Sequence, residues 1–168
     1  MRRFLLVFAV VANILLADAL TKELAAGYLK GSAAISVVDG FFNLAYVENR
    51  GCAWGMLQGQ SWPLAAFGAV ALALMVWKRK SLFFEPGRSA WGRRLCAAAE
   101  PLIYAGILGN MIDRLFRGFV IDFLDFHWGE SYHFPCFNVA DVCITLSAAF
   151  ILTASFLHDR GKGDSRPS

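Results

Sequence analysis

The chain has 168 residues, of which 57% are hydrophobic and 17% charged, and its net charge at pH 7 is +3. Soluble domains carry about 25% charged residues, so this composition excludes an ordinary soluble domain and indicates a membrane protein. The basic residues fall in short clusters between apolar runs, which argues against a nucleic-acid-binding surface. Each membrane-spanning helix needs roughly 20 apolar residues, so the length allows about four spans.

Four apolar runs follow one another along the chain. They lie at residues 4–20, 62–77, 95–112 and 137–157, and the first two are near the lower length limit for a span. We therefore predict an all-α polytopic membrane protein with four transmembrane helices and a small β-rich cradle on the extracytoplasmic (periplasmic) side. The whole chain, residues 1–168, is expected to form one integral membrane domain.

The distribution of lysine and arginine orients these spans. With the N-terminus inside, the inner segments carry 11 of these residues, and the outer loops at 21–61 and 113–136 carry 5. The positive-inside rule then places both termini in the cytoplasm. Arg2 and Arg3, the apolar run and "ADA" at 17–19 also resemble a cleavable secretory signal peptide. An aspartate before the cleavage point and three further spans favour a retained first helix.

The two outer loops contain patterns typical of β-strands. "ISVVDGFFNLAYV" (35–47) has two β-prone runs around Asp39-Gly40, a common hairpin turn. "FVIDFLDFHWGESYHF" (119–134) alternates with period 2 before a turn at Gly129-Glu130. We expect a small, aromatic-rich sheet on the outer surface. It either cradles an extended peptide or only anchors the protein at the membrane interface.

One acidic residue stands out in the last apolar run. "FNVADVCITLSAAFIL" (137–152) contains Asp141, which has no lysine or arginine within fifteen residues on either side. Ionisable groups near hydrocarbon are costly and usually face a protein or water-filled interior. In the predicted topology, other polar residues reach the same outer level: Asp18, Asn49, Asn110, Asp113, Arg114, Asp122 and Asn138. The sequence therefore predicts a site at the outer membrane face.

Structural roles alone explain some of these residues. Asn138 suits the N-cap of the fourth span, and Asp141 would then lie in its first turn, where the helix dipole favours a carboxylate. Asp18 and Lys22 form an i,i+4 pair that is weak if exposed, and Asp18 can hold a nearby loop. The adjacent residues at 113–114 point apart on a helix, so each needs another partner. None of these roles explains a second buried acid near Asp141.

Four sequence blocks carry a resemblance to a known family. They are "DALTK" (18–22), "NRGCAWG" (49–55), "GNMIDRLFRGFVIDF" (109–123) and "FNVAD" (137–141). In this order they resemble the motifs D-x-x-[ST]-K, N-x-G-x-[AS]-[FW]-G, G-N-x-x-D-R-x-x-x-G-x-V-x-D-F and F-N-x-A-D of the lipoprotein signal peptidases, signal peptidase II. The resemblance covers residues 4–158, and its third and fourth blocks together are highly specific.

The resemblance implies site residues at the matching positions. Asp122 and Asp141 correspond to the catalytic aspartates of the family. The supporting and substrate-binding positions fall on Asp18, Lys22, Asn49, Gly51, Asn110, Asp113, Arg114, Asn138 and Ala140. The chain departs from the family at Val47-Glu48, where many members pass directly from tyrosine to asparagine, and this affects the register at Asn49. Glu100 belongs to no recognised motif.

The resemblance also implies an activity. It is that of an aspartyl endopeptidase in the bacterial cytoplasmic (inner) membrane, with its active site at the outer face. Its substrates are prolipoproteins bearing a diacylglyceryl-cysteine, cut on the N-terminal side of that cysteine. Membrane lipid is the other expected partner, with no nucleic acid and a monomeric state. No cofactor is expected, and the histidines and cysteines show no zinc-motif spacing.

The chemistry of two neighbouring carboxylates agrees with this activity. Two carboxyls that share a site do not both ionise easily, so the pair holds one proton. The ionised carboxylate activates a water, and the protonated carboxyl donates to the scissile carbonyl. We expect Asp122 and Asp141 to lie within reach of one shared water. The sequence does not indicate which of them holds the proton.

Two other functional classes remain as alternatives. A small proton-coupled transporter also concentrates aspartate and asparagine in the membrane, although four short spans without an inverted repeat disfavour it. A non-enzymatic membrane scaffold would tolerate the loss of Asp122 or Asp141. Asparagine substitutions at these two positions distinguish both alternatives from a peptidase.

Overall fold

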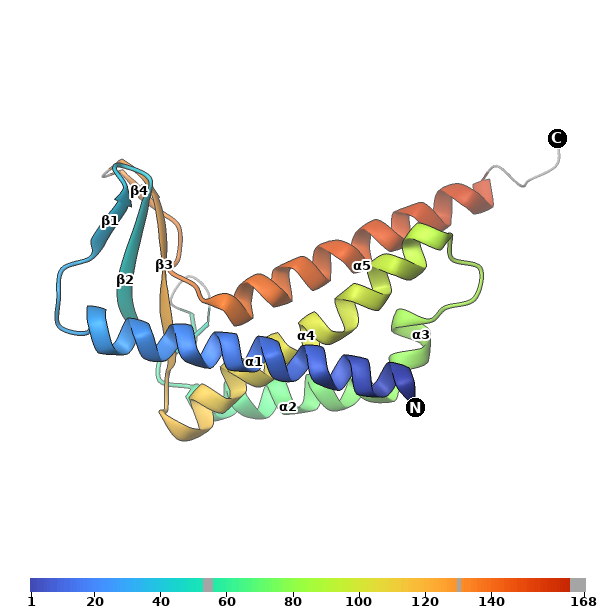
Figure 1. The fold of residues 1–168 in the computed structure, drawn as a ribbon, viewed down its shortest axis with the longest axis horizontal. Coiled ribbons are helices and arrows are strands. Elements are labelled where there is room, and N and C mark those ends of the chain that lie inside the picture. The colour runs from blue at the N-terminus through green and yellow to red at the C-terminus, as the bar shows by residue number, and fades with distance from the viewer. Residues whose placement is uncertain (53–55, 130, 164–168) are drawn as a thin grey trace.

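The computed structural model describes residues 1–52, 56–129 and 131–163, the last six of these by their backbone alone. Of the five helices in the described residues, four run roughly side by side, a short one lies at one end of them, and a small sheet stands at the other end (Figure 1). The helices are α1 (Arg2–Leu29), α2 (Ser61–Trp77), α3 (Arg79–Phe83), α4 (Ala90–Phe116) and α5 (Val139–Gly163). The N-terminal end of α1 lies at the end away from the sheet.

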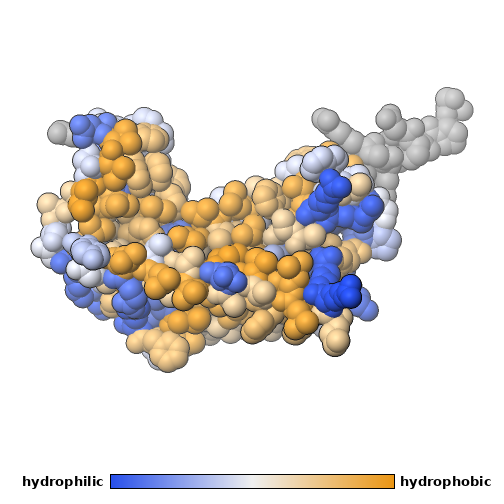
Figure 2. Space-filling view, in the orientation of Figure 1, coloured by the Kyte–Doolittle hydropathy of each residue, from blue (hydrophilic) through white to orange (hydrophobic). Residues whose placement is uncertain are grey.

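The helices have the lengths and compositions of a multi-pass membrane protein. Three are long and apolar enough to cross a bilayer, at Arg2–Leu29, Ala90–Phe116 and Val139–Leu157. α2 is apolar but has only 17 residues, about 25 Å at 1.5 Å per residue. Hydrophobic surface covers much of the middle of the molecule, and hydrophilic side chains gather toward both ends (Figure 2). A fourth crossing by α2 stays a prediction.

The first helix continues past residue 20, where a loop was predicted, and ends at Leu29. One face of its last two turns is buried, because Ala25 and Leu29 pack with Ile121 and Phe123 beneath the sheet. The polar residues after position 20 suggested a loop, but one of them is fully buried and ion-paired, as described below. α4 likewise extends beyond its predicted bounds of 95 and 112 at both ends.

The predicted aromatic-rich sheet is present. Its antiparallel strands are β1 (Ile35–Val38), β2 (Phe42–Asn49), β3 (Val120–Trp128) and β4 (Tyr132–His133), in that order. The predicted Asp39-Gly40 turn joins β1 to β2, with Gly40 at φ +70°, a conformation that glycine adopts without steric cost. At the second predicted turn Gly129 has φ +60°, and Glu130 lies outside the described residues.

A β-bulge sets the register of β2 against β3. Leu44 pairs with Leu124 and Val47 pairs with Asp122, so β2 has one residue more than β3 between these pairs. After the bulge Asn49 pairs with Val120, which puts its side chain on the same sheet face as that of Asp122. A slip of one residue would turn Asn49 to the other face. Val47 and Glu48, where the sequence departs from the family motif, therefore come directly after the bulge that determines which sheet face the Asn49 side chain lies on.

α4 is the central helix, and two glycines let its neighbours approach at the level of the sheet. A Cβ at position 106 would lie 2.6 Å from the backbone oxygen of Ala140 and from Cγ1 of Ile144. A Cβ at position 109 would lie 2.7 Å from Oδ2 of Asp18. These close approaches bring the first turn of α5 and the middle of α1 against α4.

At the other end of α4, a buried carboxylate ties three helices together. Glu100 is completely buried and forms ion pairs with Arg3 of α1, at 3.3 Å, and with Arg79 of α3. A buried carboxylate needs such partners, since an unpaired charge in the interior is strongly destabilising. Glu100 thus anchors the end of the molecule opposite the sheet.

We predict that Gly106→Ala destabilises the folded protein by about 1–3 kcal/mol, the usual cost of overpacking. The new methyl group would meet the backbone of α5, which cannot move away as a flexible side chain can. Gly27→Ala is the matched control, since a Cβ there meets nothing within 4 Å and alanine favours helix. Unfolding of both variants in mixed micelles measures the effect, and equal stabilities would contradict this packing.

Candidate active site

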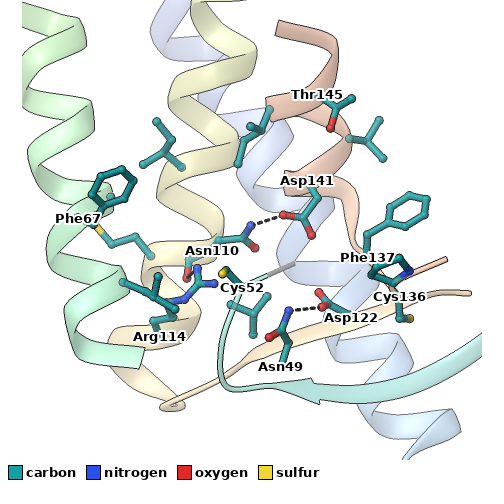
Figure 3. Close-up of a pocket in the computed structure, with 18 of the residues that line it drawn as sticks. Asn49, Cys52, Phe67, Asn110, Arg114, Asp122, Cys136, Phe137, Asp141 and Thr145 are labelled. Atoms are coloured by element: carbon teal, nitrogen blue, oxygen red, sulfur yellow. Dashed lines mark hydrogen bonds between the residues drawn. The ribbon is translucent and has the colours of Figure 1, made fainter. Parts of the chain in front are cut away.

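A pocket of about 980 Å³ lies where the sheet meets the helices. Asp122 on β3 and Asp141 in the first turn of α5 both line it. Figure 3 shows their carboxyl groups facing the same space, each hydrogen-bonded to an asparagine, Asn49 or Asn110. The two predicted acids therefore come from different elements into one pocket.

Asp122 is only 1% exposed and has no cationic partner in the described part of the chain. Its Oδ2 accepts a hydrogen bond from Asn49 Nδ2 at 2.9 Å, and its Oδ1 accepts one from Asn138 Nδ2 at 2.7 Å. Burial, followed by the charge of Asp141, raises the pKa of Asp122 to about 7, although both amide hydrogen bonds lower it. This carboxyl is therefore poised to hold a proton near neutral pH.

Asp141 lies at the N-terminus of α5 and exchanges hydrogen bonds with Asn138. The backbone N–H of Asp141 donates to Asn138 Oδ1 at 3.0 Å, and the backbone N–H of Asn138 donates to Asp141 Oδ2 at 3.3 Å. This reciprocal arrangement is a capping box, so the predicted capping role of Asn138 is confirmed. Because Asn138 Nδ2 also donates to Asp122, one asparagine contacts both carboxyl groups.

Asn110 holds the other oxygen of Asp141. Its Nδ2 donates to Asp141 Oδ1 at 2.7 Å. Its own Oδ1 accepts from Lys22 Nζ and from Asn138 Nδ2, both at 3.2 Å. An amide oxygen with two donors cannot exchange places with its nitrogen without losing both bonds. The orientation of Asn110, and with it the donor to Asp141, is therefore fixed.

The buried ammonium of Lys22 holds Asn110 and two carboxylates in place. Lys22 is 1% exposed, and its Nζ lies 2.7 Å from Asp18 Oδ2 and 2.9 Å from Asp113 Oδ2. The Lys22 ammonium donates hydrogen bonds to Asp18 and to Asn110, and its contact with Asp113 is an ion pair. Asp18 Oδ1 in turn accepts the backbone N–H of Ala140 at 2.9 Å. The predicted i,i+4 pair is thus buried, and it joins α1, α4 and α5.

The loop after β2 is attached to α4 by Arg114. Its guanidinium donates to the backbone oxygen of Gly51 at 2.9 Å and to that of Asn110 at 3.4 Å. The N–H of Gly51 donates to Asn49 Oδ1 at 3.0 Å, and a Cβ on Gly51 would collide with the oxygen of Met56. Residues 53–55 of the second motif lie outside the described residues.

All eleven predicted site residues lie within this connected group, but other pocket residues were not predicted. Cys52 and Cys136 line the pocket beside the acids. Burial above all, and then the nearby Asp122, raises the pKa of the Cys136 thiol to about 12, so it remains neutral. The apolar lining on α2 also went unpredicted, because that helix is apolar on every face and its sequence does not mark one side as functional.

We predict that Lys22→Met destabilises the protein by about 3–5 kcal/mol, because it leaves the buried carboxylates of Asp18 and Asp113 without their shared cation. Thermal unfolding in detergent measures this loss. Lys30→Met is the control, since Lys30 is exposed where it pairs with Glu48 and lies over the Tyr46 ring, and little change is expected there. Similar small effects of both substitutions would contradict a structural role for the buried ammonium.

Comparison with known proteins agrees with the motifs. The profile of the family described as signal peptidase (SPase) II matches residues 10–157. A lipoprotein signal peptidase of Symbiobacterium thermophilum is 38% identical over 154 residues, which cover 91% of each chain. One of Clostridium acetobutylicum is 36% identical, over 91% of this chain and 95% of that one.

The fold also matches solved structures. A bacterial membrane enzyme determined by the in meso method at 2.3 Å resolution superposes with a TM-score of 0.76 at 26% identity, over 96% of this chain and 92% of that one. A second, at 1.9 Å resolution, gives a TM-score of 0.70 at 28% identity, over 89% and 91% of the two chains. By its sequence profile and its relatives, this multi-pass membrane protein belongs to the signal peptidase II family.

Proposed function

We propose that this protein is an aspartyl endopeptidase that removes the signal peptide from prolipoproteins, cutting on the N-terminal side of a diacylglyceryl-modified cysteine. The observation that carries the proposal is the pair Asp122 and Asp141, which line one pocket and are both hydrogen-bonded to Asn138. Membership of a peptidase family and the names of the relatives support the reaction type.

The environments of the two acids suggest different roles. Asp122 has its pKa raised to about 7, so it holds the shared proton and donates a hydrogen bond to the scissile carbonyl oxygen. Asp141 accepts two hydrogen bonds at a helix N-terminus, which suits the ionised partner that takes a proton from the attacking water. The proton on Asp141 then passes to the leaving amine, which restores the pair. Apparent pKa values from kinetics belong to the two carboxyls together.

The proposed orientation places this pocket at the outer face of a bacterial cytoplasmic membrane. Four spans, counting α2, leave both termini in the cytoplasm. Basic residues support this orientation, because they concentrate at the ends of the helices away from the sheet: Arg2, Arg3, Lys78, Arg79, Lys80, Arg93 and Arg94. We further propose that the protein acts as a monomer on substrates drawn from the surrounding lipid.

The sheet is proposed to hold the substrate peptide in an extended form. β3 carries Asp122, and β2 carries Asn49, so a peptide lying against these strands meets the carboxyls directly. Main-chain pairing along a sheet gives affinity with little side-chain selection, which suits an enzyme that accepts many precursors. A proline placed in the sheet removes a main-chain hydrogen-bond donor. If it lowers the stability of the protein in the membrane but leaves turnover unchanged, the sheet has a purely anchoring role instead.

We predict that Asp122→Asn and Asp141→Asn each lower cleavage of a lipidated precursor by about 100-fold or more, since each removes a proton-transfer group. Asparagine preserves the shape of the side chain, so both variants should insert and fold. Glu85→Gln, which changes a half-exposed acid near the opposite end, is the matched control. Near wild-type turnover in either aspartate variant would exclude that residue from catalysis and favour a transporter or scaffold.

We predict that kcat/KM falls as the pH rises above about 7, because Asp122 then loses its proton. The direction of this pH dependence follows from the proposed role of Asp122, whose protonated carboxyl is needed for the reaction and is present below its pKa. The same raised pKa also makes the folding stability depend on pH. Between pH 3.8 and about pH 7 the free energy of unfolding falls as the pH rises, because Asp122 ionises more readily in the unfolded chain than in the folded one. A pH–rate profile with no alkaline decline between neutral pH and pH 9 would assign the proton elsewhere.

A further inference from the structure

Two histidines face each other on β3 and β4, toward the end of the sheet that lies away from α1 (Figure 1). His127 and His133 are direct cross-strand partners, so their side chains leave the same sheet face with Cβ atoms about 5 Å apart. The centroids of their rings are 5.0 Å apart, with 15° between the ring planes. His127 comes five residues after Asp122, so the pair lies about 17 Å further along β3 and on the opposite sheet face.

The buried member of this pair, His127, has one ring nitrogen without a partner. Its side chain belongs to a residue only 8% exposed, and its Nδ1 lies 2.9 Å from the backbone oxygen of Gly129. A carbonyl oxygen only accepts, so in the neutral ring Nδ1 carries the proton and Nε2 carries the lone pair. This Nε2 is buried and has no hydrogen-bond partner among the described residues. A buried acceptor left unpaired costs free energy, so a ligand at Nε2 would stabilise the sheet.

The other member, His133, has its Nδ1 engaged in the same way. This Nδ1 lies 3.4 Å from Asp125 Oδ1, and Asp125 Oδ2 accepts a hydrogen bond from Asn43 Nδ2 at 3.2 Å. A carboxylate also only accepts, so Nδ1 of His133 carries the proton and its Nε2 carries the lone pair. The side chain of His133 is 56% exposed. Its ring therefore has room to turn, and solvent reaches the pair from this side.

Metal-binding histidines show this hydrogen-bond pattern. A histidine that ligates a metal through one ring nitrogen usually donates the other N–H to a carboxylate or a backbone carbonyl. Here Asp125 and Gly129 supply these two acceptors. Two imidazoles on one tetrahedral Zn²⁺, with each nitrogen about 2.0–2.1 Å from the ion, have ring centroids about 5 Å apart. The observed separation is 5.0 Å, so the exposed His133 ring needs to turn toward His127 but the strands need not move apart.

The two ligands determine the class of ion. Neutral imidazole suits zinc, copper and nickel, whereas magnesium and calcium prefer oxygen ligands. In the part of the chain that the structure describes, no group of three histidine, cysteine or acidic residues could hold a metal, so water would take the remaining coordination positions. The spacing of the histidines matches no zinc motif in the sequence, because the two rings meet across a pair of strands.

We propose that His127 and His133 bind a divalent transition-metal ion such as Zn²⁺ through their Nε2 atoms. The ion clamps β4, a strand of two residues, to β3. The chain after His133 forms a wall of the large pocket at residues 134–137, so the clamp also restrains this wall. The site is independent of the proposed peptidase activity, and metal binding and stability are the measurements that test it.

The first test titrates the tag-free protein in detergent with zinc chloride by calorimetry. His127→Gln and His133→Gln should each raise the Kd for zinc by about 100-fold or more, because each removes one of two protein ligands. Asp125→Asn should raise it by about 10-fold, as is typical on changing a residue that orients a ligating histidine. His158→Gln is the matched control and should keep the wild-type Kd, since the third histidine lies toward the far end of α5.

The second test separates loss of the site from loss of the fold. Zinc should raise the Tm of the wild type but not that of His133→Gln, whose exposed position makes the substitution tolerable for folding. X-ray absorption of the zinc-loaded protein should show two imidazole nitrogens at about 2.0–2.1 Å. No zinc binding by the wild type would overturn the proposal. Unchanged binding by His133→Gln, or a spectrum without imidazole ligands, would place the ion elsewhere and overturn it as well.

Discussion

The buried ammonium of Lys22 is the interaction on which the rest of the site depends. An isolated charge is expensive in an apolar interior, so Lys22 needs acidic partners, and Asp18 and Asp113 supply them from two helices. The ammonium also donates to the amide oxygen of Asn110, and the amide nitrogen of Asn110 in turn donates to Asp141. The Lys22 ammonium does not line the pocket, yet through Asn110 it fixes the orientation of the Asp141 carboxyl, which does.

The same network explains how two acids can share one pocket. Asp18 holds the first turn of α5 through the N–H of Ala140, and this requires the close approach that Gly109 permits. Asn138 then caps α5 and reaches across to Asp122. The neutral amides between the two carboxyls restrain both without neutralising either. Each acid therefore keeps the freedom to carry or release the proton that peptide hydrolysis moves.

Local patterns in the sequence predicted much of this structure. The apolar runs indicated the long helices, and the Asp39-Gly40 turn and period-2 pattern indicated the sheet. The motif blocks named every residue of the polar network. The end of α1 was misplaced because Lys22 is as hydrophilic in sequence as any loop residue, and its burial becomes possible only with its acidic partners on α1 and α4. The bulge that aims Asn49 depends on strand pairing, which no short stretch of sequence specifies.

The apolar part of the pocket was beyond prediction for a related reason. In a membrane helix, lipid-facing and ligand-facing positions are equally apolar, so periodicity does not separate the pocket-lining residues of α2 from their neighbours. Glu100 likewise belongs to no motif, yet its two arginine partners show it to be the anchor of the opposite end.

The central claim is that Asp122 and Asp141 hold one proton between them, mainly on Asp122. Isotope-edited infrared spectroscopy of labelled aspartate carboxyls, followed through a pH titration with the Asp122→Asn spectrum as the assignment, tests it most directly. The account predicts an Asp122 midpoint near 7 that falls in Asp141→Asn, where the like charge is gone, but stays above its ordinary value because the side chain remains buried. A midpoint near 4 that does not respond to Asp141→Asn would contradict the shared proton.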